Sequence, residues 1–309
     1  MYRLKGNNIR MNDKELFFEG NHSIRLRDLQ LKALEILLYF KDFCDEHKLK
    51  FFLCGGSCIG AIRHKGFIPW DDDIDMFMPR NDYERLEELW NKYADTQKYS
   101  CCRSNKDINY KHPMTTIRDN NTTFIRDYQA GLDVNHGVRI DIIPYDGCPE
   151  SKIKRLIQIG WAFVFHLFNR EATSSTHFKY IGKIGEIILR IIKNKDTRYK
   201  IWKYAEGQMT KYPINKDTKY VTDLCSYFRF IKIRYPKEYF DDIIYREFEG
   251  HQMPIPIGYD GYLKMAFGDY MELPPEEERE PKHGAVYIDL ENSYKNYRGI
   301  YYLKDSDKM

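Results

Sequence analysis

The sequence predicts an α/β fold in which a small mixed sheet has flanking helices and a helical insertion. Apolar residues recur at helical spacing in residues 28–47, which is typical of an amphipathic helix. Short strand-like segments then alternate with helical segments as far as residue 143, and residues 151–212 have a helical pattern. A chain that alternates strands with helices commonly folds as a sheet covered by helices.

Composition and charge exclude several classes of protein. Of the 309 residues, 42% are apolar and 31% are charged, which is enough material for a buried core. Lys and Arg outnumber Asp and Glu by only 49 to 46, so the chain lacks the charge that holds proteins on nucleic acid, and we expect no nucleic-acid partner. The first residues lack the apolar core of a secretory signal, and the seven cysteines are irregularly spaced. We therefore expect a cytoplasmic protein without a disulfide framework.

The elements of the first half follow from local patterns. Residues 51–54 form an apolar run that ends at Gly55 and Gly56, which predicts a buried strand and a tight turn. Ser57 is expected to cap a short helix that ends near residue 63.

The next strand is expected at residues 74–78, where apolar residues alternate with others and Pro79 closes the run. Asn81 with Glu84 resembles a capping box and should open a helix that ends near residue 93. Two further strands are expected at residues 115–125 and 137–143, the latter closed by Pro144.

The second half changes character. Residues 151–212 carry two apolar stretches flanked by Lys and Arg, which predicts a helical insertion, and about the last hundred residues are rich in Tyr, Pro and Gly, which predicts loops with short elements. We therefore divide the chain into an N-terminal extension (1–25), a core with the acidic residues (26–150), the insertion (151–212) and a C-terminal segment that completes the active-site cleft (213–309).

An acidic motif leads into the strand at residues 74–78. Alternate residues of a strand share a face, so Asp73 and Asp75 should point the same way, with Asp71 beside them if the strand begins early. Asp141 lies between apolar residues, where an unpaired acid is costly, and is the best candidate for a third acid on a neighbouring strand. Mg²⁺ prefers such oxygen ligands, and two ions could assist a displacement at phosphorus.

The alternative for these aspartates is a solvated acidic loop, which the apolar residues around them disfavour. Gly55 and Gly56 could be an ordinary turn, but between a strand and a helix their amides can bind phosphate together with Ser57. Arg63 and His64 could neutralise phosphate charge.

The stretch FFLCGGSCIGAIRHKGFIPWDDDIDMFMPRNDYERL, residues 51–86, resembles the signature of the LicD family, the bacterial phosphorylcholine transferases related to fukutin and fukutin-related protein. Residues 136–146 and 259–275 also resemble family segments, so three ordered blocks cover the chain from about residue 25 to 290. The insertion is the least family-like part, and Phe267 stands where the family usually has Tyr.

The resemblance implies a polymerase-β-like nucleotidyltransferase fold, one or two Mg²⁺ ions, and a CDP-alcohol donor whose phospho-alcohol moves to a cell-surface glycan with release of CMP. By position, Asp73 and Asp75 would be metal ligands, Asp71 an accessory acid, and Asp141 the third carboxylate and a base for the acceptor hydroxyl. CDP-choline is the leading donor. Its ammonium group could meet aromatic faces. The pocket candidates are Trp70, Tyr145 and, for phosphate, His283.

Several alternatives stay open at this point. Ethanolamine, glycerol or ribitol phosphate could replace phosphocholine. A nucleotidyltransferase that modifies a small molecule or tRNA would use the same acids but release pyrophosphate, and a noncatalytic glycan-binding relative would have no need of them.

One stretch of the insertion raises the question of a membrane. Residues 156–168 are too short to span a bilayer, yet they carry Trp161, Phe163, Phe165 and Phe168 with basic residues at the ends, the composition of an interfacial helix. A lipid-linked glycan acceptor would then be met at the inner face of the membrane. The other interpretation is a buried helix.

Overall fold

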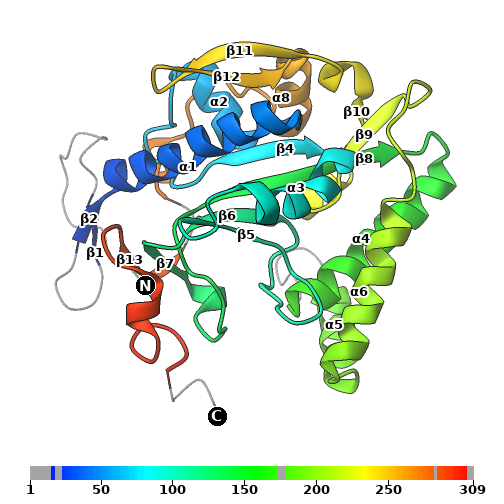
Figure 1. Ribbon diagram of the computed structural model, residues 1–309. Helices are drawn as coiled ribbons and strands as arrows, with labels where there is room; N and C mark the ends of the chain where they lie inside the picture. The colour runs from blue at the N-terminus through cyan, green and yellow to red at the C-terminus, as the bar shows by residue number, and fades with distance from the viewer. Residues whose placement is uncertain (1–14, 18–22, 173–178, 282–283, 305–309) are drawn as a thin grey trace.

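The computed structural model in Figure 1 describes residues 15–17, 23–172, 179–281 and 284–304. Its centre is a mixed sheet of seven strands in the order β10-β9-β8-β4-β3, with β6 and then β5 joined to β8. In this sheet β4 and β8 run parallel and the other described pairs run antiparallel. This mixed α/β arrangement agrees with the predicted fold class. The strands are β3 (Phe52–Leu53), β4 (Asp75–Pro79), β5 (Tyr99–Cys102), β6 (Thr115–Asp119), β8 (Arg139–Cys148), β9 (Tyr220–Asp223) and β10 (Tyr235–Pro236).

Helices cover this sheet. The long helix α1 (Leu26–His47) has the predicted amphipathic character, since Leu29, Ile36 and Phe40 are fully buried. The helix α3 (Arg80–Tyr93) contacts β4, β5 and β8. Figure 1 shows α2 and α8 near the hairpin of β11 and β12, above the sheet in that view. Their bounds are α2 (Gly55–Arg63), β11 (Ile243–Phe248), β12 (His251–Pro256) and α8 (Tyr259–Phe267).

Two predicted helix starts are wrong, because tertiary contacts replace the expected caps. The helix α2 begins at Gly55, so Ser57 lies inside it, and the Ser57 hydroxyl instead accepts a hydrogen bond from the backbone N–H of Asp75 at 2.9 Å. The helix α3 begins at Arg80 after Pro79, so Asn81 is not its cap. The Glu84 side chain binds Arg80 and Arg103 rather than a capping N–H.

The predicted strand limits also need correction. Residues 115–125 form two strands, β6 and β7 (Thr123–Arg126), separated by a turn. The strand β8 does not end at Pro144 but continues to Cys148. On the side of β8 away from β4, residues 139–142 pair with β6 and residues 145–148 pair with β9. The N–H of Asp141 donates to the carbonyl of Ile74, on the β4 side of the strand. Because backbone groups alternate in direction along a strand, the nitrogen of Pro144 points to the opposite side, into the gap between β6 and β9. On that side no described strand pairs with β8 at this point, so the missing N–H of proline costs little.

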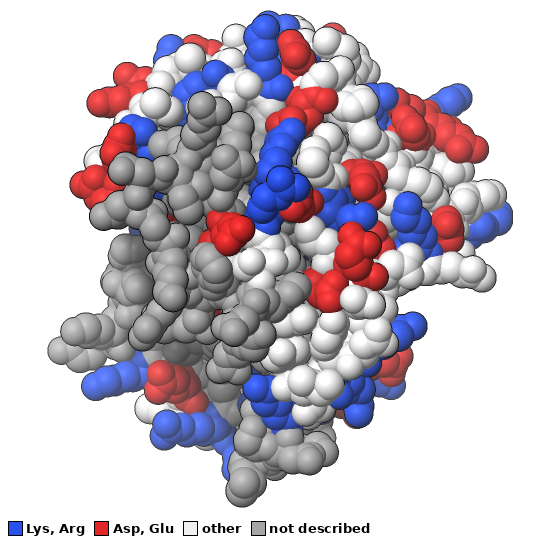
Figure 2. Space-filling view, turned by 90° about the vertical axis from the view of Figure 1, so that its left-hand side faces the viewer, with Lys and Arg blue, Asp and Glu red and all other residues white. Residues whose placement is uncertain are grey.

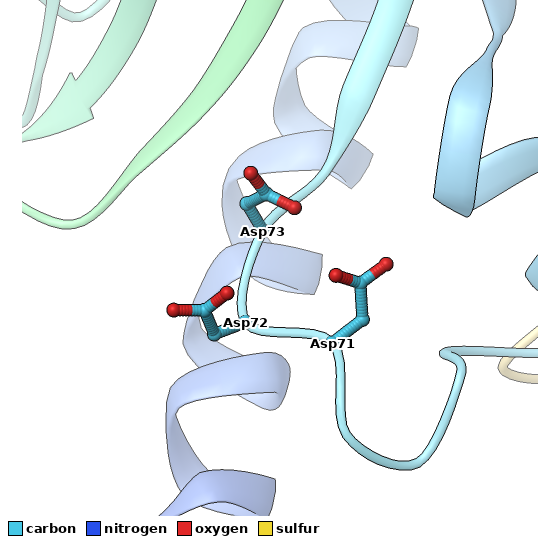
Figure 3. Close-up of side chains that lie close together, drawn as sticks. All are labelled: Asp71, Asp72 and Asp73. Atoms are coloured by element: carbon cyan, nitrogen blue, oxygen red, sulfur yellow. The ribbon is translucent and has the colours of Figure 1, made fainter. Parts of the chain in front are cut away.

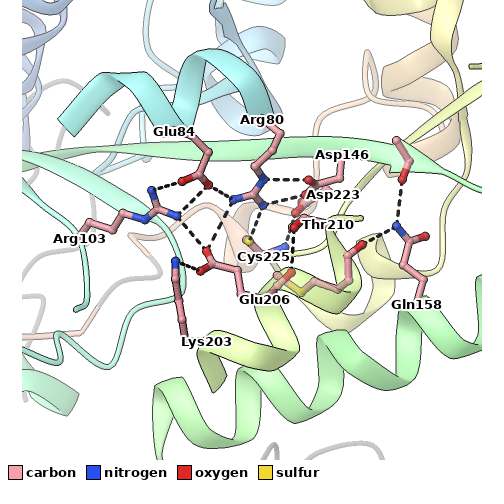
Figure 4. A network of polar contacts seen from close by, with 12 residues as sticks. Arg80, Glu84, Arg103, Asp146, Gln158, Lys203, Glu206, Thr210, Asp223 and Cys225 are labelled. Carbon is pink, nitrogen blue, oxygen red and sulfur yellow. Dashed lines mark hydrogen bonds and ion pairs between the residues drawn. The ribbon is translucent and has the colours of Figure 1, made fainter. Parts of the chain in front are cut away.

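The insertion is helical, as predicted, and consists of α4 (Lys152–Arg170), α5 (Lys179–Ile191) and α6 (Lys195–Met209). Ala162 and Phe165 of α4 are buried together with Trp202 and Ala205 of α6 in the core cluster. Ion pairs join α6 to the sheet domain, as Figure 4 shows for Arg103 and Glu206. No helix in the described part of the chain is both long enough and apolar enough to span a bilayer.

The C-terminal segment is more regular than the expected loops. Besides β9 to β12 and α8, it supplies the short helix α7 (Phe228–Ile231) and the strand β13 (Ala285–Asp289), which pairs with β7. The described part of the N-terminal extension forms a hairpin of β1 (Glu15–Phe17) and β2 (Ser23–Arg25). On the face shown in Figure 2, the coloured Lys and Arg residues are interspersed with Asp and Glu, without a large patch of one sign.

Candidate active site

Three carboxylates meet where β4 and β8 begin. Asp75 and Asp141 are paired in the parallel register of the two strands, and Asp73 lies in the extended segment just before β4. The Asp141 N–H donates to the carbonyl of Ile74 at 2.9 Å, which fixes this register. One oxygen of each of the three side chains lies within 4.8 Å of the others. The arrangement offers hard oxygen ligands at the spacing that a divalent cation needs.

Asp71 lies on the other side of Asp73. Oxygens of Asp71, Asp72 and Asp73 also lie within 4.8 Å of one another, but Figure 3 shows the Asp72 carboxylate on the opposite side of the chain from that of Asp71. The amide of Gln30 on α1 donates to the carbonyl of Asp71 at 2.8 Å and holds the loop in place. The accessory position predicted for Asp71 is therefore sterically available.

The two glycines make room for these acids. A Cβ at Gly56 would lie 2.5 Å from an oxygen of Asp71, and Gly55 adopts a φ of +52° with its missing Cβ 3.5 Å from an oxygen of Asp75. The Gly55 N–H already donates to the hydroxyl of Tyr262 at 3.0 Å. Gly55 and Gly56 therefore let carboxylates approach the start of α2, and the amide of Gly55 is not free for the predicted phosphate contact.

The carboxylates differ in their electrostatic surroundings. Burial, and then the charge of Asp73, raises the pKa of both Asp71 and Asp75 well above the ordinary value. For Asp141, burial acts in the same direction, but Arg139 and His112 outweigh it and lower the pKa. The Asp141 oxygens lie 3.0 Å from Nε of Arg139 and 3.3 Å from Nε2 of His112. Without a cation, Arg139 and His112 thus favour the ionised form of Asp141, whereas burial and neighbouring charges disfavour the ionised forms of Asp71 and Asp75.

Arg139 is a site residue that the sequence reasoning missed. It lies two residues before Asp141 in β8, so the strand alternation places both on one face. The alternation of side chains that predicted a shared face for Asp73 and Asp75 could also have identified Arg139 as a neighbour of Asp141. His112 also contacts Asp141, and burial lowers the pKa of His112 to about 3, so it does so as a neutral ring.

A cavity of about 220 Å³ opens beside the acids. Asp71, Asp73 and Asp75 line it together with Gly55 and Gly56. The remaining walls come mostly from the C-terminal segment and are largely aromatic. They include Asp223, Tyr227, Arg229, Phe230, Tyr235, Tyr262 and Phe267. Tyr262 and Phe267 belong to the segment 259–275 that resembles the family, whereas no motif singled out Asp223, Tyr227, Arg229, Phe230 and Tyr235. Burial raises the pKa of Asp223 to about 6.

Several predicted site residues lie elsewhere. Arg63 is at the end of α2, where its Nη1 donates to the carbonyls of Tyr270 and Glu272, and its Nε contacts His64. Trp70 is buried with the guanidinium of Arg279 5.7 Å from its ring centroid. Tyr145 packs in an aromatic cluster around Phe240. None of Arg63, His64, Trp70 and Tyr145 is among the residues that line the cavity, and His283 lies outside the described residues.

Comparison with known proteins gives a consistent family. Residues 48–155 match the family described as LicD/FKTN/FKRP, nucleotidyltransferase domain. The chain is 34% identical over 270 residues to the lipopolysaccharide cholinephosphotransferase LicD of Haemophilus influenzae. The match covers 84% of this chain and 96% of that protein. Two shorter matches are to uncharacterized proteins of Rickettsia. The protein of Rickettsia prowazekii is 33% identical over 19% of this chain and 23% of its own length. The protein of Rickettsia typhi is 31% identical over 21% of this chain and 22% of its own length.

Proposed function

Because the chain belongs to the LicD family, we propose that it transfers phosphocholine from CDP-choline to a sugar of lipopolysaccharide or a related cell-surface glycan. The observation that carries this proposal is the cavity that is lined both by carboxylates and by aromatic rings. The family description also supports a polymerase-β-like nucleotidyltransferase core around β4 and β8.

The proposed reaction is a displacement at phosphorus. The oxygen of a sugar hydroxyl attacks the phosphorus that bears choline, the bond from this phosphorus to the bridging oxygen breaks, and CMP leaves while the hydroxyl proton passes to a base. Such a reaction depends mainly on positioning and on charge stabilisation. The protein contributes by orienting the diphosphate beside the carboxylates of the cavity.

Asp73, Asp75 and Asp141 are the proposed ligands for one or two Mg²⁺ ions, with Asp71 as an accessory acid. The fit rests on three hard oxygen ligands within 4.8 Å of one another. A bound ion would supply positive charge to the phosphate and leaving-group oxygens. The pairing of Asp141 with Arg139 supports a role for Asp141 as an ionised ligand rather than as the base for the acceptor hydroxyl.

The aromatic residues that line the cavity support a cationic alcohol. A trimethylammonium group is attracted to the faces of aromatic rings. Phe230 and Phe267 already carry a cation on their faces, since the guanidinium carbon of Arg229 lies 4.4 and 5.7 Å from the two ring centroids. Tyr227 is 61% exposed at the same cavity and is our candidate for the choline contact.

Release of CMP tests this function. The protein is incubated with Mg²⁺, lipopolysaccharide and either CDP-choline, CDP-ethanolamine, CDP-glycerol or CDP-ribitol. We expect CMP with CDP-choline, and we expect Tyr227→Ala to raise KM for CDP-choline several-fold more than for CDP-glycerol, which lacks the positive charge. Pyrophosphate released from a nucleoside triphosphate would instead favour a nucleotidyltransferase, and no turnover of any nucleotide would favour a noncatalytic relative.

We also propose peripheral contact with the inner face of the membrane, where a lipid-linked acceptor would lie. Two of the four aromatic residues that suggested this contact are not available, because Phe165 and Phe168 are only 2% and 5% exposed. The most exposed apolar side chains of the insertion are aliphatic. On α5, Ile184, Ile187 and Ile191 are 58%, 54% and 75% exposed at the spacing of one helix face, close in sequence to Lys183, Arg190 and Lys193. We call these three isoleucines the α5 face.

A further inference from the structure

Arg229 is the one basic residue among the described residues that line the cavity. The same cavity is lined by four aspartates, Asp71, Asp73, Asp75 and Asp223. Bound Mg²⁺ would offset part of this negative charge, but a diphosphate brings further negative charge into the cavity. Arg229 is therefore the cationic side chain that can give such an anion a charge-assisted hydrogen bond.

Two aromatic rings hold the guanidinium of Arg229. The residue belongs to the short helix α7, and its guanidinium carbon lies 4.4 Å from the ring centroid of Phe230 in the same helix and 5.7 Å from that of Phe267 at the end of α8. The centroids of the two rings lie 5.4 Å apart, and the ring planes meet at 56°. The rings form a corner from two elements of the C-terminal segment, and this corner limits where the guanidinium can lie.

The contacts with the rings leave the N–H donors of Arg229 available. A contact of this kind uses the flat face of the guanidinium, whereas the donors point outward in its plane. Arg229 forms no hydrogen bond or ion pair with another described residue, and it is exposed, so its donors face water in the free protein. An anion that enters the cavity can replace this water without first breaking a polar contact within the protein.

The residues that the sequence assigned to phosphate do not have this position. Arg63 donates to the carbonyls of Tyr270 and Glu272. His64 lies 2.9 Å from Nε of Arg63. Neither Arg63 nor His64 is among the residues that line the cavity, whereas Arg229 has both the location and the available donors that the role requires.

The position of Arg229 also affects where a choline group can lie. A guanidinium on the faces of Phe230 and Phe267 repels a second cation there. Tyr227, the ring proposed above for choline, lines the same cavity, and its ring centroid lies 6.4 Å from that of Phe230. Phosphate at Arg229 and choline at Tyr227 would match the two oppositely charged parts of phosphocholine.

We propose that Arg229 binds the diphosphate of the nucleotide donor and that Phe230 and Phe267 are positioning residues that hold its guanidinium for this contact. This inference rests on the proposed function. A guanidinium presents paired N–H donors that match two oxygens of a phosphate, and its charge stabilises the charge that develops on the leaving phosphate. The donor is favoured over a phosphate of the acceptor, because the proposed Mg²⁺ ligands and Tyr227 line the same cavity.

Calorimetry on the full chain with Mg²⁺ tests the role of Arg229, with CDP-choline, inorganic pyrophosphate and cytidine as separate probes. We expect Arg229→Met to weaken CDP-choline and pyrophosphate roughly tenfold or more, as for loss of a charge-assisted hydrogen bond, and to leave cytidine unchanged. Arg229→Lys keeps the charge but not the paired donors, so it should recover only part of the affinity.

Arg246→Met is the matched control. Arg246 is another exposed arginine on an aromatic ring, with its guanidinium carbon 5.8 Å from the ring centroid of Tyr259, but it does not line the cavity. The variant loses the same charge as Arg229→Met, and it should bind all three probes like the wild type.

Phe267 provides a test of positioning. Phe267→Leu keeps an apolar side chain but removes the ring, and it should weaken pyrophosphate several-fold, because the guanidinium loses one of its two supporting rings. Phe267→Tyr keeps the ring and should bind pyrophosphate like the wild type. In the Arg229→Met background, Phe267→Leu should have no further effect, since the ring acts through the arginine. Pyrophosphate carries no choline, so this result is independent of any contact between Phe267 and the ammonium group.

The outcomes separate this role from the alternatives. Arg229 is exposed, so its variants should keep the fold, which far-UV circular dichroism checks. Wild-type affinity for pyrophosphate and CDP-choline in Arg229→Met overturns the proposal, as does a loss no larger than in Arg246→Met. A rise only in the KM for lipopolysaccharide also overturns it, because the arginine would then serve the acceptor. If pyrophosphate affinity depends on Arg229 but no CDP-alcohol yields CMP, the proposed function fails and the phosphate site stands.

Discussion

Asp73, Asp75 and Asp141 bring three carboxylates within 4.8 Å of one another, and this proximity has an energetic consequence. The pKa of Asp75 is raised by burial and by the charges of Asp73 and Asp141, so the group resists full ionisation without a cation. The positive charge of Arg139 forms an ion pair with Asp141, and no such pair with Asp73 or Asp75 is seen among the described residues. A divalent cation would therefore stabilise the folded protein as well as serve the reaction, and the two effects can be measured independently.

We predict that Asp75→Asn lowers the rate of phosphocholine transfer roughly a hundredfold or more, because it removes a charged ligand at constant volume. Mg²⁺ should raise the melting temperature of the wild type by binding the folded state, and the shift should be smaller in Asp75→Asn. Without Mg²⁺, the variant should be at least as stable as the wild type, because one of the repelling charges is gone.

Asp119→Asn is a matched control for this prediction. Asp119 is 2% exposed, does not line the cavity, and accepts a hydrogen bond from the Asn121 N–H that an asparagine oxygen can also accept. It should respond to Mg²⁺ like the wild type. Transfer within about tenfold of the wild-type rate in Asp75→Asn, or an unchanged Mg²⁺ shift, would contradict the metal assignment.

At the scale of residues, the predictions of neighbouring side chains depended on their alternation between the two faces of a strand. Alternation along a strand was enough to predict that Asp73 and Asp75 share a face, and the apolar neighbours of Asp141 pointed to the third acid, which the pairing of β4 with β8 brings beside them. Arg63 and His64 were chosen because they follow the Gly-rich turn, but a helix of nine residues carries them away from its start. Nothing in the sequence marks Arg126 as a residue whose Nε and Nη2 are buried without a hydrogen-bond partner among the described residues, since that property arises only from how the elements pack.

At the scale of elements, α4 shows why composition alone did not distinguish a membrane helix from a buried one. Its aromatic residues Phe165 and Phe168 pack in the core cluster with Trp202 of α6, so they belong to the interior. Phe163 is 38% exposed, yet its ring lies 4.7 Å from that of Phe228. Exposed aliphatic side chains occur on α5 and also at Ile153, Leu156 and Ile157 of α4, and on α5 they share one helix face.

We predict that the protein co-floats with anionic vesicles at low salt and that Ile187→Glu together with Ile191→Glu reduces the bound fraction several-fold. The α5 face would lose apolar contact and gain charge that anionic lipid repels, and high salt should weaken the remaining attraction. Far-UV circular dichroism should stay unchanged, because both side chains are more than half exposed.

The control for this prediction is Leu31→Glu on α1, another exposed apolar position, with 42% exposure. It should bind vesicles like the wild type. If neither protein floats at low salt, or if Leu31→Glu reduces binding as strongly as the α5 changes, the α5 face is not the membrane contact.

Periodicity predicted which elements exist better than it predicted where they begin and end. The helices at residues 28–47 and 151–212 and the strand at 74–78 are present, because burial of an apolar face depends on spacing alone. The limits at Ser57, Asn81 and Pro144 were wrong, since each depends on contacts far away in the sequence. Ser57 bonds to Asp75, and Glu84 of the supposed capping box bonds to Arg103. Pro144 lies at the gap between β6 and β9.

At the scale of the whole molecule, a buried ionic network connects the insertion to the sheet domain (Figure 4). Arg80 at the start of α3 binds Asp146 of β8, and Arg103 after β5 binds Glu206 of α6 at 2.9 Å. Gln158 of α4 donates to the carbonyls of Gly147 and Met209 at 2.9 and 2.8 Å. Two helices of the insertion are thus fastened to the strand that carries Asp141, and we infer that insertion and sheet domain unfold together.

We predict that Asp146→Asn lowers the free energy of unfolding by roughly 3 kcal/mol, because it leaves the buried charge of Arg80 without its two-atom partner. Glu84→Gln is the control. It removes another partner of Arg80, but its side chain is 47% exposed, so the loss should stay below about 1 kcal/mol. Urea denaturation followed by circular dichroism gives both values.

The double variant Arg80→Met with Asp146→Asn should be more stable than Asp146→Asn alone, because the unpaired charge is gone, and this separates the cost of a buried charge from the loss of packing.

With Trp70 and Trp90 replaced by Phe, tryptophan fluorescence reports the insertion alone through Trp161 of α4 and Trp202 of α6. That transition should coincide with the circular dichroism of the whole chain in wild type and variants alike. An insertion that melts at lower urea, with Asp146→Asn as stable as Glu84→Gln, would mean that the network does not join the two parts.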